Sequence, residues 1–134
     1  MIDATHVGPD TASVTAGMAV LDRFLAALNA RDQAALLATM HFPHYRLAGV
    51  AMRVWEQPDD SYLAGFYARA GEGWHHTNWD FRRVVAAGPE KVHLDVQFTR
   101  YRADNSPLGS FRSLYIVTRR DGVWAIQARS SFAG

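Results

Sequence analysis

Two histidines and a tyrosine lie close together in the segment His41-Phe42-Pro43-His44-Tyr45. Histidine titrates near neutral pH, so His41 or His44 could act as a general acid or base, with Tyr45 beside it as a substrate contact. No carboxylate that would orient either ring is evident in the sequence. The structural alternative is that both histidines cap the carbonyl end of a helix. We predict His41 and His44 as the candidate catalytic residues.

Arginine supplies almost all of the positive charge, because Lys91 is the only lysine among 14 basic residues. Arg100 and Arg112 stand in consecutive β-rich segments, and the register that groups the apolar side chains points both inward, together with Ser130. An inward guanidinium is unfavourable unless a negative group or water meets it. It binds carboxylates, enolates and phosphates through paired hydrogen bonds. We therefore expect a pocket for an anionic or enolisable ligand. The alternative is that both arginines lie at the rim and extend into water.

Other side chains are predicted to complete this substrate-binding pocket. Trp55 and Trp79 could stack against a flat organic ligand, although core or interface positions are the commoner use of aromatic residues. Thr77 and Ser130 would supply hydroxyl groups for hydrogen bonds. Ser130 is not predicted as a nucleophile, because neither a Gly-x-Ser-x-Gly turn nor a supporting histidine and acid pattern accompanies it.

Composition and spacing exclude several classes of function. The chain has no cysteine, which excludes disulfides, thiolate zinc sites and a cysteine nucleophile. His75 and His76 are adjacent in a predicted strand and point to opposite faces, so we expect no metal site. The formal charge of +1 argues against bulk nucleic-acid binding. No apolar run reaches membrane length, and the first ten residues (MIDATHVGPD) lack the features of a signal peptide. We expect a cytoplasmic protein that uses no cofactor, binds no nucleic acid and spans no membrane.

The elements that position these residues follow from periodicity and turn signals. A helical apolar stripe begins at Val14, and Asp32 can cap a second, shorter helix that reaches Met40 and ends at Pro43. A third helix starts near Ser61. A short strand pair and four longer β-rich segments complete the chain, at residues 45–55, 74–86, 91–103, 109–120 and 123–132. Helices followed by an antiparallel meander predict an α+β fold, with the helices on one face of a curved sheet.

Strand alternation predicts which side chains share a face. The even-numbered side chains of the 91–103 segment, Arg100 included, are expected to face the helices. The next segment is expected to pair so that Phe98 lies opposite Leu114 and Arg100 opposite Arg112. The outer face of this register carries three aromatic residues, Tyr101, Phe111 and Tyr115. An exposed aromatic stripe of this kind predicts a homodimer through the outer sheet face.

The same reasoning applies to two further registers. At Asp121-Gly122, a two-residue turn would place Ile126 opposite Val117 on the outer face, whereas a three-residue turn would place it opposite Ile116 on the inner face. We prefer the three-residue turn because it groups the large apolar side chains. The inward side chains of the 74–86 segment are expected to be Trp79, Phe81 and Val85, with His75, Thr77 and Arg83.

Four segments and the order of the elements carry a family resemblance. The segments are FLAALNARD in the first helix, HFPHYRL after the second, GWHHTNWD at the start of the meander and LYIVTRRDGVWAIQARSSF at the end. Over residues 13 to 132 the chain resembles the nuclear transport factor 2-like superfamily, in the SnoaL-like and ketosteroid-isomerase-like branch and in a bacterial subgroup without an assigned activity. The resemblance implies a single SnoaL-like domain over residues 13–134, after an N-terminal arm of residues 1–12. It implies a cone-shaped curved antiparallel sheet wrapped around the N-terminal helices (a cystatin-like roll), a pocket between sheet and helices, and often a homodimer.

The superfamily includes isomerases, dehydratases, cyclases, binding proteins and non-catalytic modules, so the fold does not determine the function. The ketosteroid-isomerase mechanism requires an aspartate base and oxyanion donors. Asp80 and Asp95 fall on the predicted outer face and Glu56 lies near a loop, so that mechanism is not carried over. Two hypotheses follow. In the first, the chain is a small-molecule-binding protein; if it is an enzyme, it is a cofactor-independent isomerase or lyase that acts by proton transfer. In the second, it is a non-catalytic homodimerisation module of the same fold.

Overall fold

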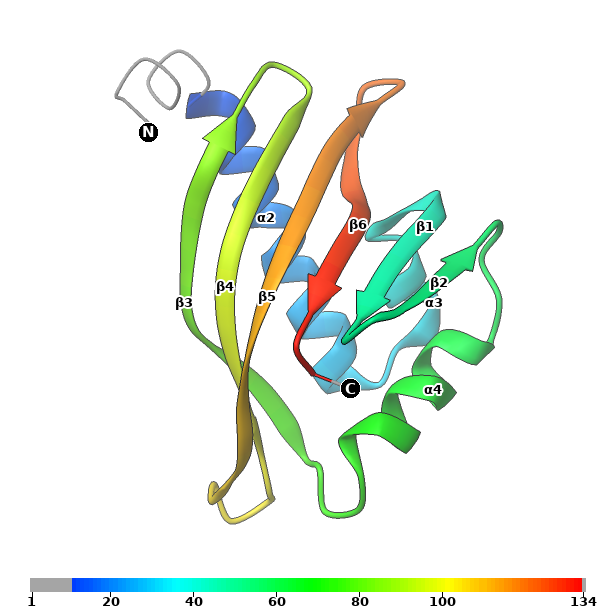
Figure 1. Cartoon of the computed structure of the whole chain (residues 1–134), viewed down its shortest axis with the longest axis vertical. Helices are drawn as coiled ribbons and strands as arrows, with labels where there is room; N and C mark the ends of the chain where they lie inside the picture. The colour runs from blue at the N-terminus through cyan, green and yellow to red at the C-terminus, as the bar shows by residue number, and fades with distance from the viewer. Residues whose placement is uncertain (1–10, 134) are drawn as a thin grey trace.

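The helices and a single sheet form two layers (Figure 1). The computed structural model describes residues 11–133, so the first ten residues of the predicted arm and Gly134 lie outside the described residues. The helices are α2 (Thr11–Ala30), α3 (Gln33–Leu37) and α4 (Ser61–Ala70). The strands are β1 (Met40–Ala48), β2 (Ala51–Trp55), β3 (His76–Ala87), β4 (Lys91–Tyr101), β5 (Pro107–Arg120) and β6 (Val123–Ser131).

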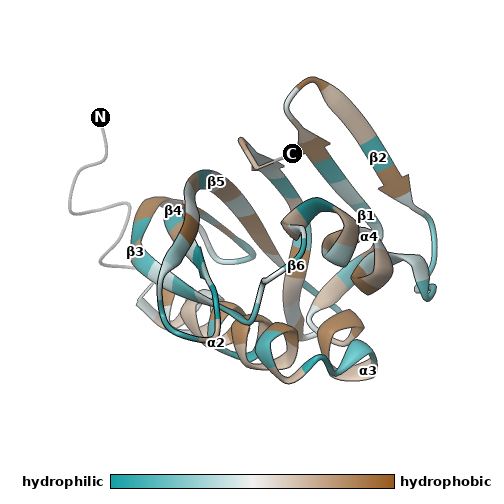
Figure 2. Cartoon of the chain, turned by 90° about the horizontal axis from the view of Figure 1, so that it is seen from below, coloured by the Kyte–Doolittle hydropathy of each residue, from teal (hydrophilic) through white to brown (hydrophobic). Residues whose placement is uncertain are grey.

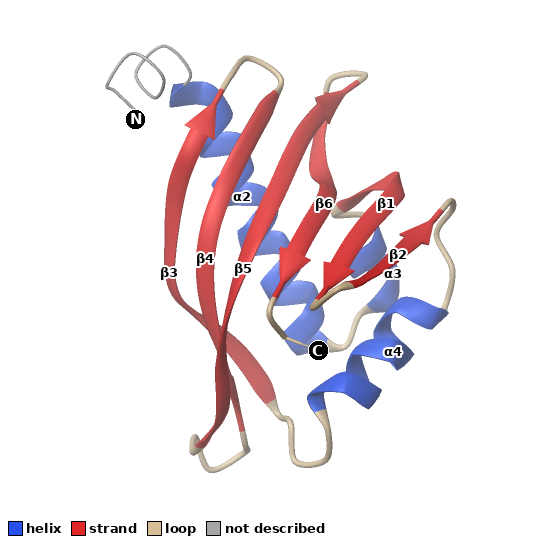
Figure 3. Ribbon diagram, viewed as in Figure 1, coloured by secondary structure: helices blue, strands red, loops and turns tan. Residues whose placement is uncertain are grey.

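The six strands form one curved, open sheet in the order β2-β1-β6-β5-β4-β3 (Figure 3). Neighbouring strands are antiparallel except β1 and β6, which run parallel. Seen from below in Figure 2, the strands curve around the helices, which all lie on the concave side. This is the α+β arrangement predicted from the sequence, with the parallel β1–β6 pair as a departure from a purely antiparallel sheet.

Helix α2 is the central helix of the hydrophobic core. Its buried residues recur with a helical period and are Ser13, Gly17, Val20, Leu21, Phe24, Ala27 and Leu28. By length and composition α2 is able to cross a membrane. Its apolar face packs against the sheet, however, as the core helix of a globular domain does, so α2 does not indicate a membrane protein.

The second helix is shorter than the sequence predicts. Asp32 caps it as expected, because its side chain accepts a hydrogen bond from the backbone N–H of Ala35 at 3.0 Å. Helix α3 nevertheless ends at Leu37, and Met40 begins β1. Pro43 lies inside β1, where the pairing with β6 is irregular, and such irregularities are positions at which a sheet tolerates proline. The segment from Met40 onward is therefore part of the sheet.

The pairing of β4 with β5 differs from the predicted register. Phe98 lies opposite Phe111 rather than Leu114, and Leu94 lies opposite Tyr115. This shift covers an odd number of residues, so it exchanges the two faces of β5. Tyr115 is consequently buried, with 1% of its surface exposed. The prediction is wrong because β5 carries apolar side chains on both faces, so grouping apolar residues does not select one register.

The turn between β5 and β6 has two residues, whereas three were predicted. Asp121 and Gly122 have positive φ angles of 52° and 78°, as a type I′ turn requires. Ile126 lies opposite Val117. Both side chains are fully buried, because the register of β4 and β5 turns Val117 inward. The two-residue turn therefore satisfies the apolar pattern once the faces of β5 are assigned correctly.

Bulges decide which residues of β6 and β3 face inward. The β5–β6 pairing shifts after Ile126, so that Arg129, and not Ser130, lies opposite the inward Tyr115. The β3–β4 pairing shifts between Trp79 and Phe81. The residues before this shift, Thr77 and Trp79, face inward as predicted. After the shift the two faces of β3 are exchanged, so Phe81, Arg83 and Val85 do not form the predicted inward set.

Candidate functional site

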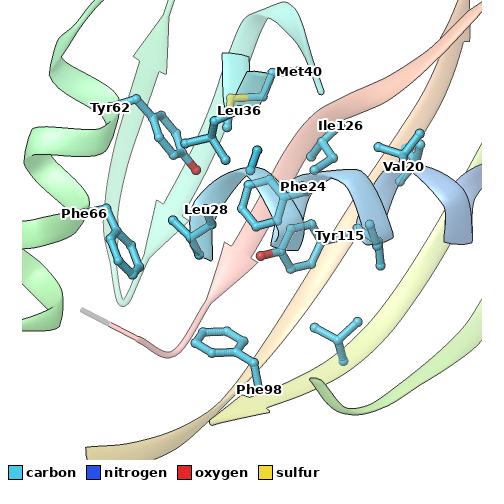
Figure 4. Packing of buried hydrophobic residues seen from close by; sticks show 14 of the residues in the cluster. Val20, Phe24, Leu28, Leu36, Met40, Tyr62, Phe66, Phe98, Tyr115 and Ile126 are labelled. Carbon is cyan, nitrogen blue, oxygen red and sulfur yellow. The ribbon is translucent and has the colours of Figure 1, made fainter. Parts of the chain in front are cut away.

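A cavity lies between α2, α4 and the inner face of the sheet. It is partly open to solvent. Its wall consists mostly of aromatic and aliphatic side chains. The lining residues are Phe24, Leu25, Leu28, Tyr62, Phe66, Thr77, Trp79, Phe98, Arg100, Tyr115 and Arg129. Figure 4 shows several of these rings converging from the two helices, β4 and β5. An apolar concave site with a few polar groups is the usual form of a small-molecule pocket.

Arg100 extends from β4 into this cavity without an acidic partner among the described residues. Its guanidinium carbon lies 4.9 Å from the ring centre of Phe111, 5.3 Å from that of Phe66 and 5.7 Å from that of Phe98. Its Nε is buried without a hydrogen-bond partner. Burial, with a smaller contribution from the charge of Arg129, lowers its pKa to about 10, so the side chain is a cation at neutral pH. Aromatic rings favour a nearby cation, and the N–H groups of a guanidinium are suited to bind an anion.

Arg129 enters the same cavity from β6. Its guanidinium carbon lies 5.0 Å from the ring centre of Tyr115, and its Nη1 donates a hydrogen bond to the hydroxyl of Tyr62 at 3.4 Å. Its Nε, like that of Arg100, has no partner. Burial raises the pKa of Tyr115, so this phenol is neutral and supplies no negative charge. Two arginines and two tyrosine hydroxyls thus offer hydrogen-bond donors to a ligand in the cavity.

Two more arginines lie close to this pair. Arg46 projects inward from β1 with 4% of its surface exposed, and Arg69 is partly buried on α4. Burial lowers the pKa of each to about 10, and the Nε of each is buried without a partner. We call Arg46, Arg69, Arg100 and Arg129 the arginine cluster. Within residues 11–133, no carboxylate forms an ion pair with any of its members.

Thr77 is held at the cavity wall by the end of α2. The side-chain amide of Asn29 donates to the carbonyl oxygen of Thr77 and accepts from its backbone N–H, both at 2.8 Å. The Thr77 hydroxyl accepts from the indole N–H of Trp74 at 2.9 Å. Arg31 adds hydrogen bonds to the carbonyl oxygens of Trp74 and His75. These contacts fasten the start of β3, and with it one wall of the cavity, to α2.

His44 is completely buried next to the cavity wall. Its Nδ1 donates to the carbonyl oxygen of Ile126 at 3.1 Å, which leaves Nε2 as the unprotonated nitrogen. This Nε2 is buried and has no partner. The ring centre lies 5.9 Å from those of Trp55 and Tyr62. Burial lowers the pKa of His44 to about 4, although the hydrogen bond to Ile126 opposes this shift. The ring is therefore neutral at neutral pH.

The structure brings Thr77, Trp79 and Arg100 of the predicted substrate contacts to the cavity. Trp55 is buried, but it packs against Tyr62 at 5.0 Å between ring centres and does not line the cavity. These placements follow from strand alternation, which the sequence shows clearly for this part of β3 and β4.

The other predicted site residues face elsewhere. Tyr45 and Ser130 lie on the outer face of the sheet, because their strand neighbours Arg46 and Arg129 face inward. Arg112 is also on the outer face, where its Nη2 lies 2.6 Å from a carboxylate oxygen of Asp95. His41 lies outside the cavity, and its Nε2 is 2.8 Å from the carbonyl oxygen of Val123. The placements predicted for Arg112 and Ser130 are wrong because the actual strand registers reverse their faces.

The predicted outer aromatic stripe is not present as such. Tyr101 stacks on His76 with 5.1 Å between ring centres. Phe111 instead contacts Arg100, and Tyr115 lines the cavity. Both face inward because of the β4–β5 register.

Three members of the cluster were not predicted from the sequence. Arg69 follows Tyr62 and Phe66 at helical spacing, so the stripe of that helix contained a signal for it. Arg46 is two residues after His44, and alternate strand residues share a face. For Arg129 no sequence signal exists, because its face depends on the bulge after Ile126.

The comparisons with known proteins agree with this architecture. The NTF2-like protein family DUF6841 matches residues 17–131. An NTF2-like protein from Pseudomonas putida KT2440 has a similar structure, with a TM-score of 0.72 at 16% identity over 90% of this chain and 86% of that one.

Two further solved structures have the same fold. A protein with a cystatin-like fold from Nostoc punctiforme PCC 73102 gives a TM-score of 0.68 at 16% identity, covering 85% of each chain. A hexachlorocyclohexane dehydrochlorinase gives 0.63 at 17% identity, over 90% of this chain and 84% of that one. No curated protein sequence matches the chain. The family match spans most of the described residues and the solved structures share the cystatin-like fold, so the chain belongs to the NTF2-like protein family DUF6841.

Proposed function

We propose that the chain is a SnoaL-like small-molecule-binding protein whose cavity takes a partly apolar, anionic ligand. The arginine cluster is the observation that carries this proposal. Buried cations without a counter-charge are unfavourable in the free protein, and a carboxylate, enolate or phosphate would supply that charge through paired hydrogen bonds. The aromatic wall would contact the apolar body of the ligand. A cytoplasmic location is part of this proposal, and the cysteine-free sequence supports it.

Mass spectrometry of the freshly purified protein tests this proposal. Under native conditions we expect a discrete added mass, which disappears when the protein is denatured. The added mass should be lost in Arg100→Gln and kept in Arg112→Gln, since Arg112 is exposed and already paired with Asp95. A protein that carries no added mass and binds no carboxylate in a titration contradicts the proposal.

A second candidate function is proton transfer at the bound ligand, by a cofactor-independent isomerase or lyase. His44 favours it, because its Nε2 is unprotonated and unpartnered and its ring neighbours Tyr62, a residue of the cavity wall. The fold shared with a hexachlorocyclohexane dehydrochlorinase supports it as well. Incubation of the ligand complex in D2O is expected to exchange a C–H proton of the ligand in the parent protein but not in His44→Phe. Equal exchange in both proteins contradicts a role for His44.

The outer sheet face supports a second copy of the chain as partner. Apolar side chains project there from β1 and β2, and Met52 is 62% exposed. The stripe consists of Tyr45, Leu47, Met52 and Val54, continued on β5 by Leu114 and Ile116. Exposed apolar surfaces of this kind are typical of interfaces, and we propose a homodimer through this face. Light scattering should show a dimer for the parent protein and a monomer for Met52→Glu. A dimeric variant would contradict the interface.

A further inference from the structure

Arg46 and Arg129 are neighbours on adjacent strands. They lie opposite each other in the parallel β1–β6 pair, and Arg53 of β2 lies opposite Arg46 on the other side. Like charges placed directly opposite each other in a sheet destabilise it. Arg53 is exposed and stacks over Trp55, 4.6 Å from its ring centre, so water screens its charge. Arg46 and Arg129 are 4% and 7% exposed and lack that screening.

The arginine cluster divides into two parts. Arg100 and Arg129 line the cavity, whereas Arg46 and Arg69 do not. Within residues 11–133, the guanidinium of Arg46 makes one hydrogen bond, in which Nη2 donates to the carbonyl oxygen of Ala133 at 3.2 Å. Arg69 has its guanidinium carbon 5.9 Å from the ring centre of Phe66. The two parts adjoin each other, because Arg46 lies opposite Arg129 in the strand pairing, and Arg69 and Arg100 both lie near the ring of Phe66.

A single monoanion does not balance this charge. Two guanidinium groups line the cavity and two lie beside it, and no carboxylate among residues 11–133 pairs with any of the four. Tyr115 is kept neutral by its raised pKa. One negative group between Arg100 and Arg129 would leave Arg46 and Arg69 with buried, unpartnered Nε atoms. Such groups require a counter-charge or hydrogen bonds.

We propose that the ligand of this cavity is a dianion, an apolar body carrying two anionic groups. Arg100 and Arg129 bind the first group at the cavity wall, and Arg46, which lies opposite Arg129, binds the second. This inference rests on the proposed function and adds the charge of the ligand class to it. Arginine is suited to both positions because its planar donors match carboxylate and phosphate oxygens.

Isothermal titration with two matched probes tests the inference. Benzoate offers one carboxylate and isophthalate two, on the same ring, and both are measured at one ionic strength. Isophthalate is expected to bind about tenfold more tightly or better, since its second carboxylate gains charge-assisted hydrogen bonds. Arg46→Gln should reduce the affinity for isophthalate to that for benzoate, and it should leave benzoate within about twofold of the parent value. Arg53→Gln is the matched control, because it removes the exposed arginine opposite Arg46, and it should change neither affinity. Circular dichroism and thermal unfolding verify that each variant is folded.

The possible failures are distinguishable. Equal affinity for the two probes, with both lost in Arg100→Gln, overturns the dianion and preserves the proposed function. An equal loss of both probes in Arg46→Gln also overturns it, because the cluster would then be a single anion site. Binding of neither probe, or binding unaffected by Arg100→Gln, contradicts the proposed function as well.

Discussion

The two faces of the sheet use arginine in opposite ways. On the outer face, Arg112 is half-exposed and its Nη2 lies 2.6 Å from Asp95, which also pairs with Arg83. On the inner face, Arg100 and Arg129 are almost completely buried, contact aromatic rings and have no carboxylate partner within the described residues. Residues 11–133 thus supply a counter-charge where water already stabilises the cations, and none where burial makes it most needed.

This difference indicates which arginines serve the fold and which serve a ligand. An exposed ion pair contributes little to stability, and its loss is tolerated. A buried cation without a partner destabilises the free protein, so its presence is better explained by a partner that arrives from outside. The inner face is therefore expected to respond strongly to ligands and to charge substitutions, and the outer face weakly.

The largest effect is expected when the missing carboxylate is built into the inner face. Arg46→Glu places an acid opposite Arg129, so an internal ion pair replaces the ligand's second group. Isophthalate affinity is expected to fall about 100-fold, or ~2.7 kcal/mol, by titration calorimetry, while the free protein unfolds at a higher temperature. Arg53→Glu, at the exposed neighbouring position, should change neither the isophthalate affinity nor the unfolding temperature. If Arg46→Glu binds isophthalate as tightly as the parent protein does, the inner face does not respond more strongly to charge substitutions than the outer face.

A smaller effect is expected from pH, again on the inner face. The pKa of His44 falls from its ordinary value of 6.5 to about 4 on folding, so between these values the unfolded chain takes up a proton and the folded protein does not. The stabilisation is fully present above pH 6.5 and is lost as the pH falls towards 4. At pH 5 the loss relative to pH 7 is about 2 kcal/mol. Urea unfolding of His44→Phe should show a correspondingly weaker pH dependence than that of the parent protein. An unchanged pH dependence in His44→Phe would show that His44 is not buried as a neutral ring.

The smallest effect is expected on the outer face. Asp95→Asn removes the ion pairs with Arg112 and Arg83, and the cost at pH 7 should be about 1 kcal/mol or less. Hydrogen bonding to Arg112 lowers the pKa of Asp95 in the folded state. This stabilisation is present above the unfolded pKa of about 4 and is lost as the pH falls through the folded value. Denaturant unfolding of the parent protein and the variant at pH 7 measures the cost of the substitution, and the same experiment at pH 3 tests whether that cost disappears. If Asp95→Asn lost as much unfolding free energy at pH 7 as the inner face loses through His44 at pH 5, the distinction between the faces would be abolished.

The sequence predicts the fold well because helical and strand periods are strong in α2, α4 and β4. Its weak point is β5, where Leu114 and Ile116 match Tyr115 and Val117 in apolar character. The local chemistry of the turn would have been the better guide there, since Asp121-Gly122 favours a two-residue turn. That turn gives the observed pairing of Ile126 with Val117.

The candidate site is predictable only in part. Arg100, Thr77 and Trp79 lie in stretches with regular alternation, so their face follows from the strand period. Arg46 follows His44 at the strand period, whereas Arg129 comes after a bulge that adds one residue to β6. Bulges arise from tertiary packing, and a single sequence does not mark them.

The contacts between Asn29 and Thr77 have a consequence for self-association. β3 is the last strand of the sheet, and an unpaired strand edge offers its backbone groups to strands of other molecules. The Asn29 amide engages both backbone groups of Thr77, and Arg31 takes the carbonyl oxygens of Trp74 and His75. The end of α2 therefore occupies the backbone groups with which another strand would pair. This prevents a strand of another molecule from pairing with β3 at the end that carries the cavity wall.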